Sequence, residues 1–145
     1  MKFSLKTCWV AFFPLLLLAN QVAYAVQDSR VARAVFTTEI VEREPVDQIL
    51  MLSNKTQSVF FFTDLRHFEG QTVTHKWVYN DKVESVVKFK VKGPRWRVFS
   101  RIYIKPSQLG KWTVVVQDES GRSVKASVFR LVEGLEQQVI LPISN

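Results

Sequence analysis

The stretch from Thr72 to Ile104 reads TVTHKWVYNDKVESVVKFKVKGPRWRVFSRIYI and decides the class of fold. Apolar and polar side chains alternate along three runs of it, and the runs are separated by Asn80-Asp81-Lys82 and by Gly93-Pro94. Alternation with a period of two indicates strands with one face on a core, whereas an amphipathic helix places apolar residues three or four apart. The stretch therefore predicts three consecutive β-strands.

The alternation also assigns one face of each run to the interior. These inward residues are Val73, His75, Trp77 and Tyr79, then Val83, Ser85, Val87, Phe89 and Val91, then Trp96, Val98, Ser100, Ile102 and Ile104. A hairpin through Gly93-Pro94 that keeps the faces matched pairs Val91 with Trp96. It also sets Lys90 opposite Arg97, since a register slip of one residue would turn buried side chains outward.

The rest of the chain shows the same kind of pattern on both sides of this stretch. Further strands are predicted at Arg30–Val41, Val59–Leu65, Lys111–Gln117 and Ser123–Leu131. Val46–Leu52 fits a short strand or a helical turn, and in the tail, residues 132–145, only Val139–Leu141 suggests an edge strand. About seven short strands, roughly ten residues apart, favour a two-sheet antiparallel β-sandwich of the immunoglobulin-like kind, with a small β-barrel as the alternative.

The N-terminus has the pattern of a cleavable signal peptide. Lys2 and Lys6 precede an apolar run, and Ala23-Tyr24-Ala25 offers small residues for cleavage before Val26. An uncleaved membrane anchor is the alternative. A membrane span needs about 20 apolar residues, however, and Asn20-Gln21 interrupts this run before it reaches that length. Residues 1–25 are therefore expected to be removed, and residues 26–145 to form a single exported domain without a membrane span.

Composition limits the chemistry of the exported domain. Its single cysteine, Cys8, is expected to leave with the signal peptide, which excludes thiol catalysis, disulfide exchange and thiolate metal sites from the mature chain. Lys2 and Lys6 leave as well, so the formal net charge falls from +7 to +5. A moderate excess of positive charge attracts anionic surfaces such as phospholipid head groups or acidic glycans. Nucleic acid is not expected as a partner of an exported protein.

Several motifs, in order and spacing, resemble a bacterial family of unknown function numbered 2914 (DUF2914). The motifs lie between Val31 and Leu131 and comprise Arg33-Ala34-Val35-Phe36-Thr37-Thr38, Arg43-Glu44-Pro45, Phe61-Phe62-Thr63, residues 70–77 (GQTVTHKW), Arg95-Trp96-Arg97 with Ser100, and residues 110–114 (GKWTV). The resemblance implies a bacterial origin and, with the signal peptide, a periplasmic location. It brings no substrate, cofactor or catalytic residue. Asp81 departs from the family pattern, which often has glycine in this turn.

The predicted hairpin gathers cations on its outer face. The residues are Lys88, Lys90, Lys92, Arg95, Arg97 and Arg101, with Tyr103 beside them. Like charges directly opposite each other cost roughly 0.2–1 kcal/mol per pair, so their presence needs a reason. One reason is an anion-binding site, since guanidinium groups offer forked donors to phosphate or carboxylate. The other is protection of an exposed edge strand against aggregation.

His75 is the candidate centre of a buried polar network. It shares inward faces with Ser100, Trp77 and Trp96, and a buried imidazole needs hydrogen-bond partners, for which the Ser100 hydroxyl is the candidate. A hydrolase centred on His75 is the alternative, but no acid shares the face of its own strand, and such chemistry needs an orienting acid within reach. A structural role is therefore expected for His75.

The sequence gives little support to two further types of site. A carbohydrate platform would use Trp77, Trp96 or Trp112 with Tyr103, although the inward phase of the tryptophans predicts that they belong to the core. A metal site is not expected, because the two histidines lie eight residues apart without further clustered ligands. Arg43 and Glu44 are expected to form a surface or inter-strand ion pair. The favoured function is a non-enzymatic periplasmic binding or accessory module, without a cofactor, whose basic face contacts an anionic ligand or protein partner.

Overall fold

The computed structural model describes residues 28–143, so the expected signal peptide and its cleavage site lie outside the described residues. Every regular element of this region is a strand. The strands are β1 (Arg30–Thr37), β2 (Ile40–Val41), β3 (Glu44–Pro45), β4 (Asp47–Ser53), β5 (Ser58–Arg66), β6 (Thr72–Tyr79), β7 (Lys82–Lys90), β8 (Arg95–Tyr103), β9 (Gly110–Gln117), β10 (Ser123–Val132) and β11 (Val139–Pro142). Within residues 28–143 there is no helix that could cross a membrane.

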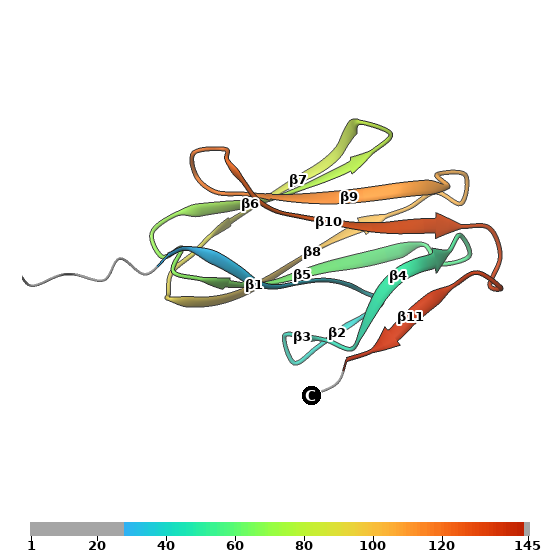
Figure 1. The fold of residues 1–145 in the computed structure, drawn as a ribbon, viewed down its shortest axis with the longest axis horizontal. Coiled ribbons are helices and arrows are strands. Elements are labelled where there is room, and N and C mark those ends of the chain that lie inside the picture. The colour runs from blue at the N-terminus through green and yellow to red at the C-terminus, as the bar shows by residue number, and fades with distance from the viewer. Residues whose placement is uncertain (1–27, 144–145) are drawn as a thin grey trace, which may run out of the picture.

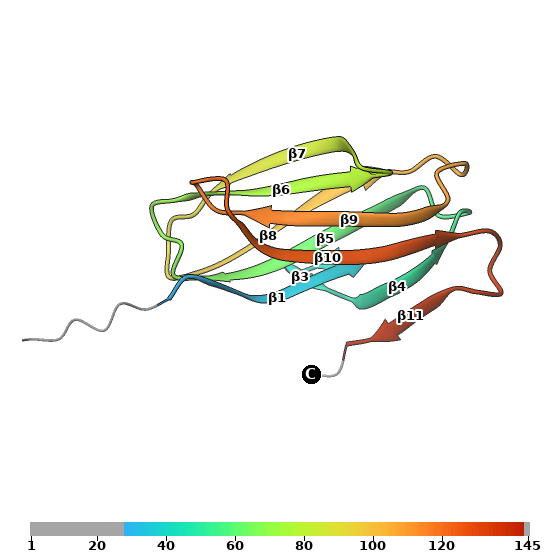
Figure 2. The ribbon, with the colours of Figure 1, turned by 45° about the horizontal axis from the view of Figure 1, so that its top comes forward.

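The strands form two sheets that pack against each other (Figure 1). One sheet has three strands in the order β1-β5-β8, and the other has six in the order β11-β4-β10-β9-β6-β7. Figure 2 shows the six strands side by side, from β7 at the top to β11 at the bottom. β2 and β3 form a separate two-stranded hairpin between β1 and β4.

The strand order is that of an immunoglobulin-like sandwich. If β1, β5, β6, β7, β8, β9 and β10 are equated with strands A, B, C, C′, E, F and G, the two sheets contain A-B-E and G-F-C-C′. The predicted sandwich is confirmed, and neither sheet closes on itself, so the alternative of a small barrel is wrong. The expectation of purely antiparallel sheets needs one correction, because β4 pairs with β10 in parallel.

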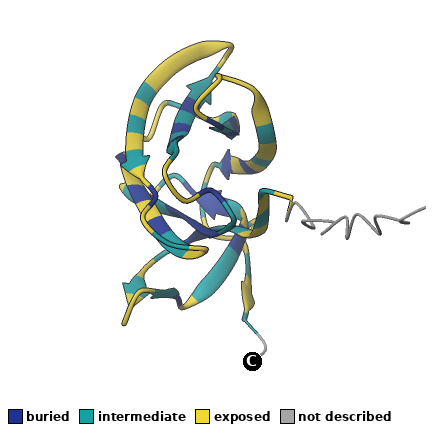
Figure 3. Ribbon diagram, turned by 90° about the vertical axis from the view of Figure 1, so that its left-hand side faces the viewer, coloured by how far each residue is buried: buried dark blue, intermediate teal, exposed yellow. Residues whose placement is uncertain are grey.

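The core lies between the two sheets and is built by the predicted inward faces. Trp77, Trp112 and Phe61 are among its largest fully buried side chains. Seen from the end of the sandwich in Figure 3, buried segments alternate with exposed ones along the strands. The chain passes from one sheet to the other after β1, where the Asp47 carboxylate accepts hydrogen bonds from the Thr37 hydroxyl (2.7 Å) and the Thr38 backbone N–H (2.8 Å).

Two turns set the register of the six-stranded sheet, and the one at Asn80-Asp81 has its predicted place. Asn80 and Asp81, with φ of 47° and 60°, form the two-residue loop between β6 and β7. Positive φ at both positions identifies a type I′ turn, which matches the twist of a hairpin. Gly121, with φ of 84°, supplies the left-handed conformation in the longer turn between β9 and β10, which glycine adopts without strain. These turns explain why β6–β7 and β9–β10 pair as neighbours.

The predicted hairpin through Gly93-Pro94 is wrong. β7 pairs with β6 in the six-stranded sheet, and β8 pairs with β5 in the three-stranded sheet, so the connection from residue 91 to 94 crosses between the sheets. Lys90 lies opposite Thr72, not Arg97. Alternation gave the correct inward faces of both strands, but a strand pairs equally well with any neighbour whose faces match it.

Smaller corrections concern strand ends and one bulge. The predicted first strand, residues 30–41, is interrupted after Thr37, and the ambiguous segment near residues 46–52 is strand β4. Val83 was expected inside, but it is 46% exposed, because a bulge in β7 at Glu84 sets it opposite Val78. An extra residue in one strand reverses the facing of the residues beyond it. The predicted edge strand near residues 139–141 is present as β11, next to β4.

Candidate functional site

The outer surface of the three-stranded sheet carries arginines in cross-strand rows. Arg66 on β5 lies between Arg30 on β1 and Arg95 on β8, and in the next row Asp64 lies between Arg33 and Arg97. Directly paired residues share a face, so these guanidinium groups gather on one side of the molecule. We call this surface the arginine face. It comprises Arg30, Arg33, Arg66, Arg95, Arg97 and Arg101 of the sheet, together with Arg43 of the β2–β3 hairpin.

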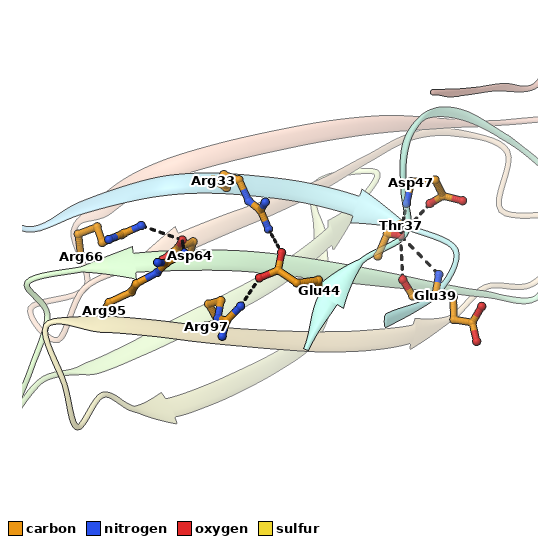
Figure 4. A network of polar contacts seen from close by, with 9 residues as sticks. All are labelled: Arg33, Thr37, Glu39, Glu44, Asp47, Asp64, Arg66, Arg95 and Arg97. Carbon is orange, nitrogen blue, oxygen red and sulfur yellow. Dashed lines mark hydrogen bonds and ion pairs between the residues drawn. The ribbon is translucent and has the colours of Figure 1, made fainter. Parts of the chain in front are cut away.

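Asp64 is a buried acid that contacts two arginines of the row Arg30, Arg66 and Arg95. Its side chain is only 4% exposed, although it points away from the core, and its Oδ2 accepts hydrogen bonds from Arg66 (3.0 Å) and Arg95 (3.3 Å; Figure 4). Its other oxygen, Oδ1, is buried and has no hydrogen-bond partner among the described residues. One carboxylate thus offsets part of the repulsion among three arginines in a row.

Glu44 is a second acid that contacts the arginines, and it comes from the β2–β3 hairpin. Its two carboxylate oxygens accept hydrogen bonds from Arg33 on β1 and Arg97 on β8, so the side chain bridges the two outer strands above β5 (Figure 4). Partial burial alone would raise the pKa of Glu44, but the hydrogen bonds and charges of the two arginines hold it below its ordinary value. Arg43 from the same hairpin donates to the Arg97 carbonyl at 3.2 Å.

The arginine face continues into an aromatic surface toward the end of β8. The Arg101 guanidinium lies over the rings of Tyr103 (4.8 Å) and Phe60 (5.5 Å). Tyr103 and Phe99 are 68% and 42% exposed. A guanidinium that interacts with a ring face through its charge can still donate hydrogen bonds to an anion. This end can therefore offer charge and apolar contact together.

The predicted basic face needs correction. Arg95, Arg97, Arg101 and Tyr103 lie on β8 in the three-stranded sheet, whereas Lys88 and Lys90 lie on β7, opposite Thr74 and Thr72 of the six-stranded sheet. Lys92 is exposed in the connection between them. Outer surfaces of two packed sheets point in opposite directions, so the lysines and the arginines form separate surfaces. The expected pairs of Lys90 with Arg97 and of Lys92 with Arg95 do not occur; the like-charged pairs of the three-stranded sheet are arginines only.

His75 lies in a buried hydrogen-bond network that joins the two sheets. Its Nδ1 lies 2.9 Å from the Ser100 hydroxyl, as predicted, and its Nε2 lies 3.0 Å from the Thr63 hydroxyl. The Trp77 indole N–H also donates to Ser100 (3.0 Å). Burial lowers the pKa of His75 to about 3, so the imidazole is neutral. The network fixes the β6 side of the core to the β5–β8 side; it does not open to the surface.

The remaining predicted site residues lie in different places. Trp96 is half-buried at the margin of the core and makes no hydrogen bond in the His75 network. Trp77 and Trp112 are buried and Trp96 is partly buried, so the described region offers no fully exposed tryptophan for a carbohydrate platform. Residues 28–143 contain no group of three potential metal ligands. Glu44 pairs with Arg33 and Arg97, so the expected ion pair with Arg43 is wrong.

Sequence reasoning missed Asp64 and Thr63, and it gave Glu44 the wrong partner. Asp64 and Arg66 stand two residues apart in a strongly apolar strand, so they share its outer face, and a carboxylate there suggests a local cation partner. The spacing of Asp64 and Arg66 could therefore have indicated this ion pair from the sequence. The contact of Glu44 with Arg97 joins residues 53 positions apart in the sequence and leaves no local signal.

The fold and site define a β-sandwich of immunoglobulin-like strand order with an arginine-rich outer face. Residues 70–131 match the model of the family described as "Protein of unknown function (DUF2914)", which confirms the predicted family resemblance over this segment. The motifs quoted between residues 33 and 63 lie outside it. No curated protein matches the chain. A solved structure similar to the chain is "Crystal structure of Se-Met labeled Beta-glucosidase from Kluyveromyces marxianus", with 11% identity and a TM-score of 0.38; the similarity covers 76% of this chain and 15% of that one.

Proposed function

We propose that this domain is a binding module, not an enzyme, and that its arginine face recognises an anionic ligand or an acidic partner. The observation that carries the proposal is the cross-strand row of Arg30, Arg66 and Arg95, in which three like charges stand on adjacent strands. Such an arrangement costs stability unless an anion offsets it. The expected signal peptide would deliver the module to the periplasm of a bacterium.

The charge balance of the face supports the proposal. Asp64 and Glu44 are the acids that contact the arginines, and each of them is shared between two guanidinium groups. Arg30, Arg43 and Arg101 make no ion pair with any described residue, so positive charge is left over. Arginine suits phosphate and carboxylate because its planar fork donates two parallel hydrogen bonds, which lysine cannot do.

A pair of matched double variants tests which surface binds. Arg95→Gln with Arg101→Gln removes two charges from the arginine face, and Lys88→Gln with Lys90→Gln removes two from the opposite sheet. We expect the arginine variant to elute from immobilised heparin at clearly lower salt than the lysine variant, because specific contacts add to the shared effect of net charge. Vesicles of phosphatidylglycerol serve as a second probe, to separate lipid head groups from soluble polyanions.

Two outcomes would contradict this assignment. Equal losses of retention for both variants would mean that net charge alone attracts the anion. A larger loss for the lysine variant would move the binding surface to the six-stranded sheet. Thermal unfolding of each variant serves as the control for intact folding.

A further inference from the structure

β8 forms an open edge of the three-stranded sheet. It pairs with β5 at nine consecutive positions without a bulge, and no described strand pairs with its other side. In a constant-type immunoglobulin sandwich this sheet has a fourth strand, D, next to strand E. Here the chain runs directly from β7 to β8, so the position of a fourth strand beside β8 is not filled by the described chain.

The backbone groups that face this edge follow from three hydrogen bonds. The Ile104 N–H donates to Gln57 O (2.9 Å) and the His67 N–H donates to Pro94 O (2.8 Å), so even-numbered residues of this segment face β5. Alternate residues of a strand direct their N–H and C=O groups to opposite sides. The groups of the odd-numbered residues from 95 to 103 therefore face the open edge. Consistent with this, the Arg97 carbonyl accepts from the Arg43 side chain at 3.2 Å.

The other three sheet edges have features that hinder the addition of a strand. β1 has a bulge near Val31, β7 has a bulge near Glu84, and β11 is four residues long and ends at Pro142. Bulges, short strands and proline are the usual means by which proteins prevent edge pairing. β8 has none of them, so it is the edge best able to accept another strand.

The side chains on either side of this edge specify what such a strand must carry. Arg95, Arg97 and Arg101 alternate along the outer face of β8. On the inner side β8 lies against β7, and there Trp96 and Phe89 are only partly buried, in contrast to Phe61 at the centre of the sheet. An added strand would meet cations on one face and incompletely covered apolar side chains on the other.

We propose that β8 binds an extended acidic segment of a partner protein, which adds to the sheet as a fourth strand. Its acidic side chains lie beside Arg95, Arg97 and Arg101, and its alternate apolar side chains cover Trp96. This inference rests on the proposed function and names the partner for the arginine face. A second copy of the chain does not fit, since edge-to-edge pairing of two β8 strands would place arginines against arginines.

The test measures binding of two fluorescent nine-residue peptides to the full chain. One alternates glutamate with valine, and the other has the same composition in two blocks. Phe99→Pro removes an edge-facing N–H without breaking a bond to β5, and Phe99→Ala is the matched control that removes the ring but keeps the N–H. We expect the alternating peptide to bind better, Phe99→Pro to weaken it by about tenfold, and Phe99→Ala by less than about threefold.

Two further measurements keep the test decisive. Binding should slow hydrogen exchange at the edge-facing amides of Arg97 and Arg101 in the wild-type chain. If Phe99→Pro fails to fold, an alternating peptide that carries N-methyl groups on one edge replaces it and should lose binding to the wild-type chain. Equal binding of both peptides, no effect of the edge block, or self-association through β8 would overturn strand addition. If heparin retention still depended on the arginines, the proposed function would survive that failure.

Discussion

Acidification from pH 7.5 to 5.5 is expected to destabilise the protein through His75. Burial holds the pKa of this imidazole at about 3 in the folded state, against an ordinary value of 6.5. Below pH 6.5 the unfolded chain therefore binds a proton that the folded chain does not bind. The stability is fully present above the unfolded pKa and is lost as the pH falls toward the folded pKa.

The size of the effect follows from the width of that window. Each pH unit between the two pKa values changes the free energy of unfolding by about 1.4 kcal/mol, so the loss reaches about 1.4 kcal/mol at pH 5.5 and about 2.7 kcal/mol at pH 4.5. The pKa of Glu44 is also lowered in the folded state, but its protonation contributes below its ordinary value of 4.5. The interval from pH 7.5 to 5.5 therefore isolates the imidazole.

Urea denaturation at pH 7.5, 6.5 and 5.5 measures this loss. The comparison is between the wild-type chain and His75→Gln, and His67 remains in both proteins, so the difference reports on His75. The variant is expected to be less stable at pH 7.5 and to lose the pH-dependent fall. The reasoning is refuted if the wild-type stability is the same at pH 7.5 and 5.5, or if the variant shows the same decrease.

Two further substitutions test the local structure. Ser100→Ala leaves the Trp77 indole N–H and one His75 nitrogen buried without a partner, so we expect a loss of about 2–4 kcal/mol in urea denaturation. The exposed Ser123→Ala is its control, and a loss below about 1 kcal/mol for Ser100→Ala would contradict the network's role. Asp81→Gly relieves a positive φ of 60° in the type I′ turn and is expected to raise the free energy of unfolding by about 0.5–1 kcal/mol. An unchanged or lower midpoint would mean that the turn carries no strain.

Alternation along the strands predicted what lies inside, and it failed to predict which strands are neighbours. His75, Trp77 and Ser100 were placed on inward faces from parity alone, and they meet at hydrogen-bond distance across the two sheets. Parity depends only on the pleat of one strand, which local sequence controls. Pairing depends on the course of the whole chain, and a short connection such as Gly93-Pro94 can close a hairpin or cross between sheets.

The error about the basic face has the same origin. Alternation correctly predicts that Lys90 and Arg97 both point away from the core. They lie on different sheets, however, and the outer faces of two packed sheets point in opposite directions. An immunoglobulin-like order of seven strands did not exclude the local hairpin, because the fourth strand lies beside the fifth when it is strand D and in the opposite sheet when it is strand C′. Here the fourth strand, β7, pairs with β6, and this non-local choice leaves no signal in the Gly93-Pro94 turn.

Edge protection and ligand binding, the two explanations for the clustered cations, are compatible on β8. Arginines along an open edge repel the same edge of a second copy, and this hinders self-association without a bulge or a proline. The same charges attract a strand of opposite charge, so they discriminate between partners instead of closing the edge. The lysines of β7 stand on a strand that a bulge already protects, and they need no such second role. The position of the arginines on the one regular edge of the described sheets therefore favours recognition over protection alone.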